Sequence, residues 1–397
     1  MVSTAQHLTD LATALASRGH EVTVIASDRG YDDPATRFQR SEHWNGIEIV
    51  RIPSLSVGKN SKWRRALNFG SFLLMCSLRL LTLRRFHLVV ALTSPPLISF
   101  LAALFVRLKG GVFYFWVMDL NPDEAIAAGW FEESSLTSRV LQTMLNYSLE
   151  VAARTIVLDR FMKERVVNKD CDPDRITIIP PWSHDDQVGY SEAAREAFRQ
   201  RHGLSDSFVV MYSGNHSPCH PLDTLLDAAR TLAVRSELVF CFIGGGSEQQ
   251  KVREFAAQHR LNNVKCLPYQ PLRELSSSLS AADLHVVVMG EKFVGIVHPC
   301  KVYNIMSIGA PTLYIGPAPS HVTDIASQQH GKIFLTRHGD VENVMAAILE
   351  AAREPARNQP FVAYSKQVLL PQLIEALEGR QDFQDFSGLV KIRSDIL

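Results

Sequence analysis

Polar residues of unusual type stand inside an apolar run at residues 293–311, FVGIVHPCKVYNIMSIGAP. Gly295 and Pro299 predict a loop, and Cys300–Ile308 has the pattern of a helix that ends at a Gly-Ala-Pro stop. Lys301 therefore falls in the first helical turn, where its charge opposes the positive end of the helix dipole. An anion beside Lys301 would relieve this conflict. The alternative is a lysine whose long side chain simply reaches solvent.

A second loop carries residue types that bind phosphate. In YSGNHSPCHPLDTLLDAA, residues 212–229, Gly214 permits a tight turn. The helix expected after Pro221 would present free backbone N–H groups, and His216 and His220 would add hydrogen bonds. The pattern predicts a phosphate site, and an ordinary loop with solvated histidines is the alternative.

A third loop is rich in glycine. Residues 242–256, FIGGGSEQQKVREFA, place Gly244, Gly245 and Gly246 between an apolar segment and a helical pattern. Their spacing matches neither the dinucleotide-binding fingerprint nor a Walker A loop. The triple glycine alone is therefore weak evidence for a bound nucleotide.

One acidic and one aromatic residue complete the set of candidates. Asp119 directly follows an apolar segment, so we expect it at the carboxyl end of a strand, as the best acid for chemistry. Its alternative role is to cap the helix after Pro122. Pro268 and Tyr269 end another apolar segment and predict an edge that binds a nucleobase, unless Tyr269 only packs against its neighbours.

Apolar segments alternate with helical patterns along the whole chain, which is typical of βαβ units and a parallel sheet. We expect strands at 21–27, 47–53, 86–96, 111–122, 154–159 and 176–182, then at 208–215, 237–246, 264–271, 284–290 and 311–316. A linker at 180–190 separates the two sets. The carboxyl ends of parallel strands share one edge, so the loops at 213–221, 244–248 and 294–304 should form one pocket for a nucleotide diphosphate.

The first half begins at a helix rather than at a strand. Met1–Thr4 leaves no room for the strand of about five residues that opens a doubly wound domain. We therefore expect the first strand of the N-terminal domain to be missing. A truncated or mis-started chain is the favoured explanation, and a fold that tolerates the loss is the alternative.

Composition narrows the class of protein. Lys+Arg 41 balances Asp+Glu 41, so we predict no nucleic-acid partner. The six cysteines are scattered without C-x-x-C spacing. This disfavours a zinc site or a disulfide framework and predicts reduced cysteines in a cytoplasmic protein. Met1–Ser17 has the pattern of an amphipathic helix rather than of a secretory signal peptide.

A basic run interrupts this neutral chain. Residues 59–85 contain no acid and hold these basic residues: Lys59, Lys62, Arg64, Arg65, Arg79, Arg84 and Arg85. Within the run, Ala66–Leu83 approaches membrane length, but Arg79 makes spanning costly. The basic helix 62–85 is predicted either to be buried or half-buried in an α/β domain, or to lie as a peripheral element on the inner face of the cytoplasmic membrane.

The order of these segments resembles glycosyltransferase family 4, and bacterial exopolysaccharide and O-antigen transferases in particular. The matching motifs, in order, are RGHEVTVIAS, LVVALTSPP, VMDLNPDEA, RTIVLDRFMKERV, ITIIPPW, VVMYSGN with LDTLLDAA, FIGGGSEQQKVREFA, VKCLPYQPLREL, AADLHVVV and PCKVYNIMSIGAP. The resemblance implies an α/β protein of the GT-B fold, with two Rossmann-like domains facing a central cleft. Domain 1–182 would be on the acceptor side, and domain 183–363 would bind the donor. In segment 364–397, a helix near 364–376 would cross back to the first domain.

The same resemblance implies a retaining enzyme that takes a UDP- or GDP-linked sugar and transfers it to a lipid-linked or growing glycan, with no metal or cofactor. Asp119 and Asn304 would be its catalytic residues. The substrate-binding residues would be Gly214, Asn215, His216, His220, Gly244, Gly245, Gly246, Pro268, Tyr269, Gly295, Ile296, Val297, His298, Lys301 and Tyr303.

The chain departs from the family where charge is expected. The Arg and Lys that hold the diphosphate correspond to Asn215 and His220, and the glutamates of the E-x7-E motif correspond to Val294 and Asn304. The Pro-x-Lys-x-Tyr pattern around Lys301 is typical of the lipid-linked branch. A non-catalytic binding or scaffold protein of the same fold is therefore one alternative function, and a sugar-nucleotide epimerase is another.

Overall fold

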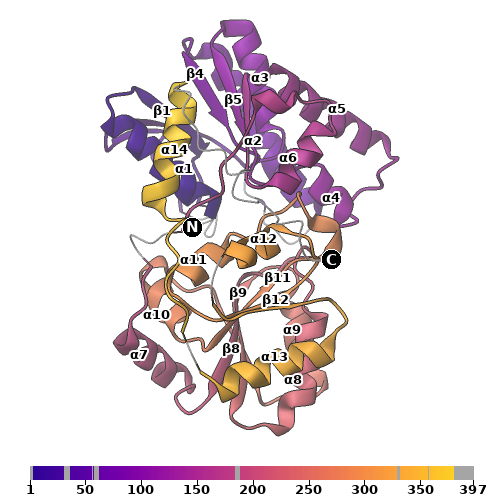
Figure 1. The fold of residues 1–397 in the computed structure, drawn as a ribbon. Coiled ribbons are helices and arrows are strands. Elements are labelled where there is room, and N and C mark those ends of the chain that lie inside the picture. The colour runs from indigo at the N-terminus through magenta and orange to yellow at the C-terminus, as the bar shows by residue number, and fades with distance from the viewer. Residues whose placement is uncertain are drawn as a thin grey trace, which may run out of the picture. The chain divides into compact units, whose positions relative to one another are not determined.

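The computed structural model describes residues 3–30, 36–55, 57, 62–183, 188–328, 331–355 and 357–379, without the side chains of residues 3, 62, 63, 65 and 66. Lys59, the middle of the predicted linker and the tail after Gly379 lie outside the described residues. The chain divides into two compact units (Figure 1). The first runs to Ile179 and takes in the chain from Leu370, and the second spans Pro180–Leu369.

The first unit alternates strands and helices. Its strands are β1 (Val22–Ser27), β2 (Ser41–Trp44), β3 (Ile47–Ile52), β4 (Leu88–Ala91), β5 (Val112–Trp116), β6 (Arg154–Val157) and β7 (Ile176–Ile178). Its helices are α1 (Ser3–Ser17), α2 (Lys62–Thr82), α3 (Ile98–Lys109), α4 (Asp123–Ala127), α5 (Leu136–Val151), α6 (Arg160–Val167) and the short 3₁₀ helix η1 (Pro173–Arg175).

The strands of the first unit form two sheets. One has the order β1-β3-β2, with β1 parallel and β2 antiparallel to β3, and the other is the parallel sheet β4-β5-β6-β7. Within the described residues no hydrogen-bonded ladder joins β1 to β4. The apolar strand β1 is only half-buried along its length.

The second unit repeats the plan with longer strands. Its strands are β8 (Phe208–Asn215), β9 (Leu238–Gly245), β10 (Val264–Leu267), β11 (Leu284–Val288), β12 (Thr312–Ile315) and β13 (Ile333–Thr336). Its α-helices are α7 (Glu192–His202), α8 (Asp223–Thr231), α9 (Gln249–Gln258), α10 (Leu275–Ser280), α11 (Lys301–Ser307), α12 (His321–Gln328) and α13 (Val341–Arg353). Its 3₁₀ helices are η2 (Leu232–Val234), η3 (Leu272–Glu274) and η4 (Glu291–Phe293). Helix α14 (Lys366–Glu378) begins in this unit and continues in the first.

The second sheet is parallel throughout, in the order β10-β9-β8-β11-β12-β13. Helices cover both of its faces. On one face Leu225 of α8 and Ile348 of α13 share a core with Tyr212, and on the other Phe198 of α7 packs with Met211. Neighbouring residues of β8 thus enter opposite cores, as the period of a strand requires. The expected α/β architecture with two Rossmann-like domains is confirmed.

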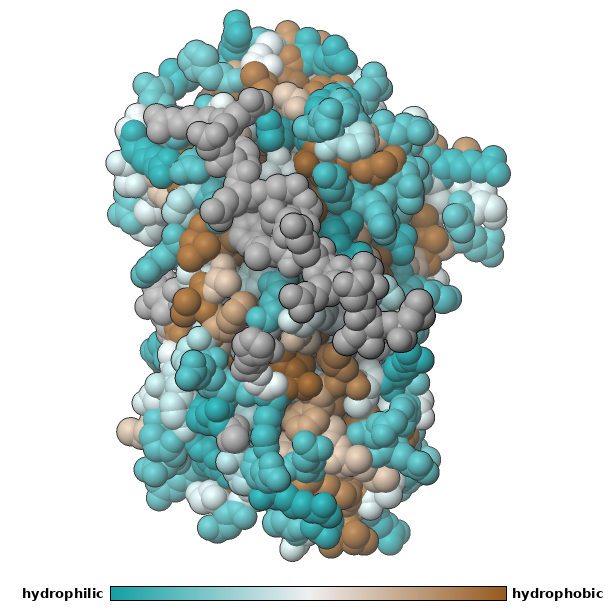
Figure 2. Space-filling view, viewed as in Figure 1, coloured by the Kyte–Doolittle hydropathy of each residue, from teal (hydrophilic) through white to brown (hydrophobic). Residues whose placement is uncertain are grey.

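Hydrophilic residues cover most of the described part of the face shown in Figure 2, and apolar residues are exposed among them. None of the helices in the described part of the chain is long and apolar enough to cross a membrane. All six cysteines are free, so the expectation of no disulfide framework is confirmed.

Candidate functional site

The second sheet brings two of the predicted loops together. From β8 the next strands along the chain, β9 and β10, lie on one side, and the later strands β11, β12 and β13 lie on the other. The neighbouring strands β8 and β11 therefore form the switch point of the sheet, where the loops after the two strands leave the sheet edge on opposite sides. Gly214 lies in the first loop, and Lys301 begins α11 after the second. The Nζ of Lys301 is 3.1 Å from the position that a Cβ of Gly214 would take, and Gly214 has a φ of 135°. A glycine is therefore required here both for its backbone angle and for the room it leaves.

Lys301 is a cationic side chain without a counter-ion. Its Nζ is buried and has no hydrogen-bond partner among the described residues. The nitrogen lies 3.6 Å from the ring centroid of Tyr212, a cation–π contact. Burial lowers the pKa of Lys301 to about 7, because an ammonium removed from water loses its hydration. The alternative in which Lys301 reaches solvent is wrong, and the arrangement leaves a place for an anion.

Two buried histidines lie beside this lysine. The Nδ1 atoms of His216 and His220 are 3.1 Å from the Gly214 carbonyl oxygen and 2.8 Å from that of Val288. A carbonyl oxygen only accepts, so each Nδ1 carries the proton. Burial, followed by the charge of Lys301, lowers the pKa of His216 to about 4 and that of His220 to about 3. The alternative of solvated histidines is wrong. Both rings are neutral at physiological pH and position the loop, rather than adding positive charge.

The glycine run fixes how closely two strand ends approach. The β8–β9 ladder continues to the pairs Gly214–Gly244 and Asn215–Gly245. A Cβ on Gly244 would lie 1.9 Å from the Gly214 carbonyl oxygen, and one on Gly246 would lie 2.2 Å from the His216 oxygen. The glycines therefore let the second and third loops pack together at the sheet edge. The sequence did not reveal this packing role.

An aromatic side chain lies at the same edge. The hydroxyl of Tyr269 donates to the Gly245 carbonyl at 3.1 Å, while 59% of the residue stays exposed. Pro268 beside it is exposed as well. A ring that is anchored at its hydroxyl and largely exposed is suited to stack on a flat ligand such as a nucleobase.

The residues between Gly295 and Tyr303 mostly support the loop from inside. Gly295 has a φ of 69°, and Ile296 and Val297 are buried. The Nε2 of the buried His298 is hydrogen-bonded to the hydroxyl of Tyr303 at 2.6 Å. These side chains therefore hold the start of α11 in place, and their contacts are made within the protein.

Asn215 and Asn304 occupy the positions where the family carries charge. Asn215 is exposed at the end of β8, and its carbonyl oxygen accepts a hydrogen bond of 2.7 Å from the Tyr212 hydroxyl. Asn304 is half-buried on α11, three residues after Lys301 and therefore on the same helix face. The second unit thus brings Lys301, Asn304 and the glycine loops to one sheet edge.

The acidic candidate lies in the first unit. Asp119 follows β5, and its backbone N–H donates to the Thr93 hydroxyl at 3.2 Å. Burial, and secondly the charge of Glu124, raises the pKa of Asp119 to about 7. Asp119 does not cap α4, whose N-cap is Pro122. An acid with a pKa near neutrality is suited to hold or release a proton at a reacting hydroxyl.

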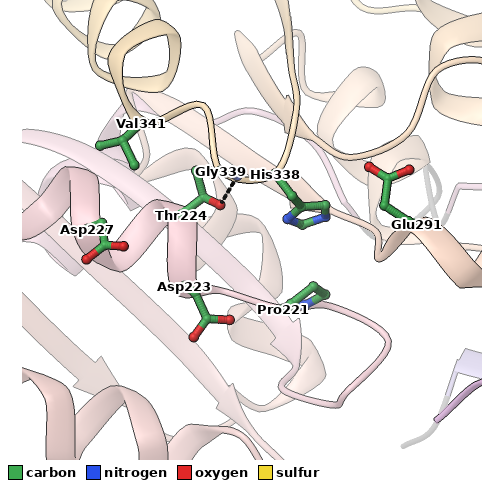
Figure 3. Close-up of a pocket in the computed structure, with 8 residues that line it drawn as sticks. All are labelled: Pro221, Asp223, Thr224, Asp227, Glu291, His338, Gly339 and Val341. Atoms are coloured by element: carbon green, nitrogen blue, oxygen red, sulfur yellow. Dashed lines mark hydrogen bonds between the residues drawn. The ribbon is translucent and has the colours of Figure 1, made fainter.

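The second unit also has a cavity of about 390 Å³ that the sequence reasoning missed (Figure 3). It lies between the start of α8, η4 and the segment before α13. His338 donates its Nε2 proton to the Met289 carbonyl at 2.8 Å, and the Gly339 N–H donates to the Thr224 hydroxyl at 2.9 Å. Glu291 follows β11 just as Asp119 follows β5, and this position was a signal that could have found it. The lining residues are Pro221, Asp223, Thr224, Asp227, Glu291, His338, Gly339 and Val341.

Comparisons with known proteins match both halves of the chain. Residues 4–182 match the glycosyl transferase 4-like domain, and residues 194–368 match the glycosyl transferases group 1 family. WcaI of Escherichia coli K12, described as a colanic acid biosynthesis glycosyl transferase, is 24% identical over 388 residues, 92% of this chain and 93% of its own. WbjE of Pseudomonas aeruginosa, described as a glycosyltransferase, is 24% identical over 62% of this chain and 61% of its own.

Solved structures share the fold at low identity. Sucrose-phosphate synthase of Thermosynechococcus elongatus has a TM-score of 0.71 and 14% identity, covering 94% of this chain and 92% of its own. HepE of Anabaena, solved with UDP and glucose, has a TM-score of 0.68 and 16% identity, covering 94% and 95%. The two family matches account for most of the chain, and these structures have the same two-domain architecture. The protein belongs to the family 4-like glycosyltransferases of the GT-B fold.

Proposed function

We propose that the protein transfers a sugar from a nucleotide diphosphate donor to a lipid-linked or growing glycan of the cell surface, with retention of the anomeric configuration. The observation that carries the proposal is the buried Nζ of Lys301, without a hydrogen-bond partner, at the switch point of the second sheet. A diphosphate suits a cation set beside glycine loops, because their backbone can approach a phosphate closely. The structures of HepE with UDP and with UDP-glucose support a nucleotide-sugar donor for this fold.

The chemistry asks the site to stabilise a leaving diphosphate. When the bond from the anomeric carbon to the phosphate oxygen breaks, its electron pair stays on the diphosphate. Lys301 and the N–H groups near Gly214 and Gly246 would stabilise that charge, so the reaction would need no metal. The acceptor hydroxyl would bond to the anomeric carbon on the same face and pass its proton to the leaving phosphate. Asn304 would hold the ribose or the sugar, and Asp119 would contact the acceptor or the reacting sugar.

A transfer assay tests this proposal. The full chain is incubated with UDP- and GDP-sugars and with lipid-linked glycans extracted from bacterial membranes, and released nucleoside diphosphate is measured with and without EDTA. We expect acceptor-dependent release that EDTA leaves unchanged, and a product with the donor's anomeric configuration by NMR. No release from any donor with any acceptor would contradict the enzyme proposal, and loss of activity in EDTA would contradict metal independence.

A non-catalytic binding protein is the second candidate, because Val294 and Asn304 stand where relatives carry glutamates. It predicts donor binding without release of nucleotide across all acceptor extracts. A sugar-nucleotide epimerase would instead convert the donor sugar without any acceptor. Product analysis of the same reactions therefore separates the three functions.

We further propose that α2 docks the protein on the inner face of the cytoplasmic membrane. Leu67, Leu74, Leu78 and Leu81 are exposed and lie on one side of this helix by their spacing of 7, 4 and 3 residues. The stripe continues on the end of α3, where Leu108 is 73% exposed and Lys109 donates from Nζ to the Leu81 carbonyl at 3.0 Å.

Positive charge accompanies this apolar stripe. Arg79, Arg107 and Lys109 are exposed around it, and the sequence of α2 contains no acid. Apolar side chains enter the boundary between headgroups and acyl chains, while basic side chains contact anionic headgroups. The Leu-rich stripe with its basic border thus favours an anionic lipid surface over a neutral one.

Vesicle co-sedimentation tests the docking surface. The double variant Leu74→Ser/Leu78→Ser should lose binding to phosphatidylglycerol-containing vesicles, and Arg79→Gln should weaken the binding by about threefold to fivefold at low salt, the effect of about 1 kcal/mol per charge. Leu136→Ser is the matched control, because Leu136 on α5 of the same unit is even more exposed than Leu74 and Leu78. Binding that persists in the double variant, or that is insensitive to salt, would contradict the docking proposal.

A further inference from the structure

The surroundings of Lys301 contain no group that offsets its charge. Its Nζ faces the ring of Tyr212 on β8, and its charge acts on His216 and His220 in the following loop and on His285 of β11. The Nε2 of His285 is 2.9 Å from the Leu279 carbonyl oxygen, and that of the buried His216 has no hydrogen-bond partner among the described residues. No carboxylate is among the titratable groups that face the nitrogen from these elements. An ammonium at this place is therefore unfavourable until an anion arrives.

Lys301 is also the one member of this group that titrates near neutrality. Burial lowers the pKa of Lys301 to about 7, while it lowers the pKa of His216 and His285 to about 4 and that of His220 to about 3. Burial raises the pKa of Tyr212 well above its ordinary value. Between about pH 6 and pH 9 only the protonation of Lys301 changes among these residues.

We propose that Lys301 takes up a proton when the diphosphate binds, an inference that rests on the donor site proposed above. In the empty site the side chain is largely an uncharged amine at slightly alkaline pH. A bound diphosphate places negative charge beside Nζ and supplies the hydrogen-bond acceptors that it lacks, and both effects favour the ammonium. Donor binding and the protonation of Lys301 then occur together. The group that stabilises the leaving phosphate becomes a cation only when the donor is present.

The sign of the pH dependence follows from linkage. Binding raises the pKa of Lys301 above its value of about 7 in the empty site, so the complex binds more protons than the free protein. Donor affinity is then highest below this pKa. Above it, Kd should rise by about tenfold for each pH unit, until the pKa of the bound state is reached.

Calorimetry of donor binding tests the proposal directly. UDP-glucose and GDP-mannose are titrated into the full chain at about pH 6 and about pH 8.5, in buffers of different ionisation enthalpy. Their diphosphates carry no group that titrates in this range, so proton uptake reports on the protein. We expect uptake close to one proton per donor at the higher pH and close to none at the lower pH. Donor binding without uptake and with constant Kd would overturn the inference, whereas no binding of either donor at any pH would overturn the proposed function instead.

Variants assign the proton to one residue. Lys301→Arg keeps a permanent charge, so its binding should take up no proton and its Kd should be constant with pH. Lys292→Met is the matched control, because Lys292 is an exposed lysine that precedes the same loop, and it should retain the uptake. Uptake that persists in Lys301→Arg would overturn the assignment to Lys301.

An NMR titration of the wild-type protein makes the test independent of how the variants fold. With lysine labelled at the ε-carbon, one resonance of the empty protein should titrate near pH 7, be absent from Lys301→Arg, and stop titrating below about pH 8.5 when the donor is bound. If every lysine resonance of the empty protein titrates above about pH 10, the inference is wrong.

Discussion

At the scale of single residues, the account depends on the contact between Lys301 and Gly214. The lysine is held over Tyr212 and under the turn at Gly214, with its Nζ 3.1 Å from the position of a Gly214 Cβ. The glycine therefore leaves room for a lysine. We propose that this one cation from α11 takes the place of the Arg and Lys that the family resemblance expects at Asn215 and His220.

Gly214→Ala should damage both the fold and donor binding. The new methyl would contact Nζ, and alanine is strained at a φ of 135°. We expect a loss of about 1–3 kcal/mol in the free energy of unfolding, measured in urea, and donor binding weakened by about tenfold or more. Gly189→Ala is the control, because no atom lies within 4 Å of its added Cβ. Equal effects of the two substitutions would contradict the packing described for Lys301.

Asp119 makes the stability of the protein depend on pH. Its pKa is raised to about 7, so between its ordinary pKa and about pH 7 the folded state binds more protons than the unfolded state. This carboxyl should therefore lower the stability as pH rises through the window, whereas His216, His220 and His285, whose pKa values are lowered from 6.5, act in the opposite direction. The wild type should thus lose stability relative to Asp119→Asn between about pH 5 and about pH 7.5, by at least about 1 kcal/mol in urea unfolding. Glu133→Gln, which changes an exposed carboxylate of the same unit, should keep the wild-type slope.

At the scale of elements, the sequence pattern predicted the strands of the described residues except two edge strands, β2 and β13. The segments at 208–215 and 284–290 are continuous apolar runs because both faces of β8 and β11 are buried. β2 has the polar sequence SEHW and is mostly exposed, so it carries no apolar pattern. β13 is a run of only four residues, IFLT, which is apolar but short and was passed over. The Asn45-Gly46 turn between β2 and β3 was a usable hairpin signal that we passed over.

The packing of β8 against β9 can be measured by comparing two glycines with positive φ. Gly46→Ala meets only Ala16 Cβ at 3.7 Å, so its cost should be the backbone strain alone, about 1 kcal/mol. Gly244→Ala would place a methyl 1.9 Å from the Gly214 oxygen and must push the strand ends apart. Thermal and urea unfolding should show that Gly244→Ala costs at least about 2 kcal/mol more. Similar costs would mean that the two strand ends are free to separate.

The candidate site was only partly predictable from sequence, and the reason is burial. The glycine loops and Lys301 were found because their residue types are unusual at strand ends. The neutrality of His216 and His220 was not, because it depends on burial and on the charge of Lys301, which only the fold brings beside them. The inward role of Tyr303 likewise depends on its contact with His298. The sequence shows which residue types a loop contains, but the packing of the fold determines which of their side chains are available to bind a ligand.

At the scale of the whole molecule, we propose that the two units have different tasks in the reaction. The second unit has an uninterrupted sheet and a cation at its switch point, which suits the binding of a nucleotide sugar. The first unit has the exposed apolar and basic side of α2 and the acid Asp119, which suit a membrane-bound acceptor. The family matches divide the chain in the same way, at 4–182 and 194–368.

Donor binding by Lys301→Met tests the central claim most directly. Binding of UDP- and GDP-sugars to the wild-type chain and to the variant is measured by calorimetry at about pH 6, where the wild-type lysine is charged. Methionine keeps most of the side-chain volume, so the test isolates the charged group. We predict that the wild type binds a nucleotide sugar and that the variant binds it at least about tenfold more weakly, the effect of losing a buried charge-assisted contact. Equal binding by the two proteins would contradict the account of this site.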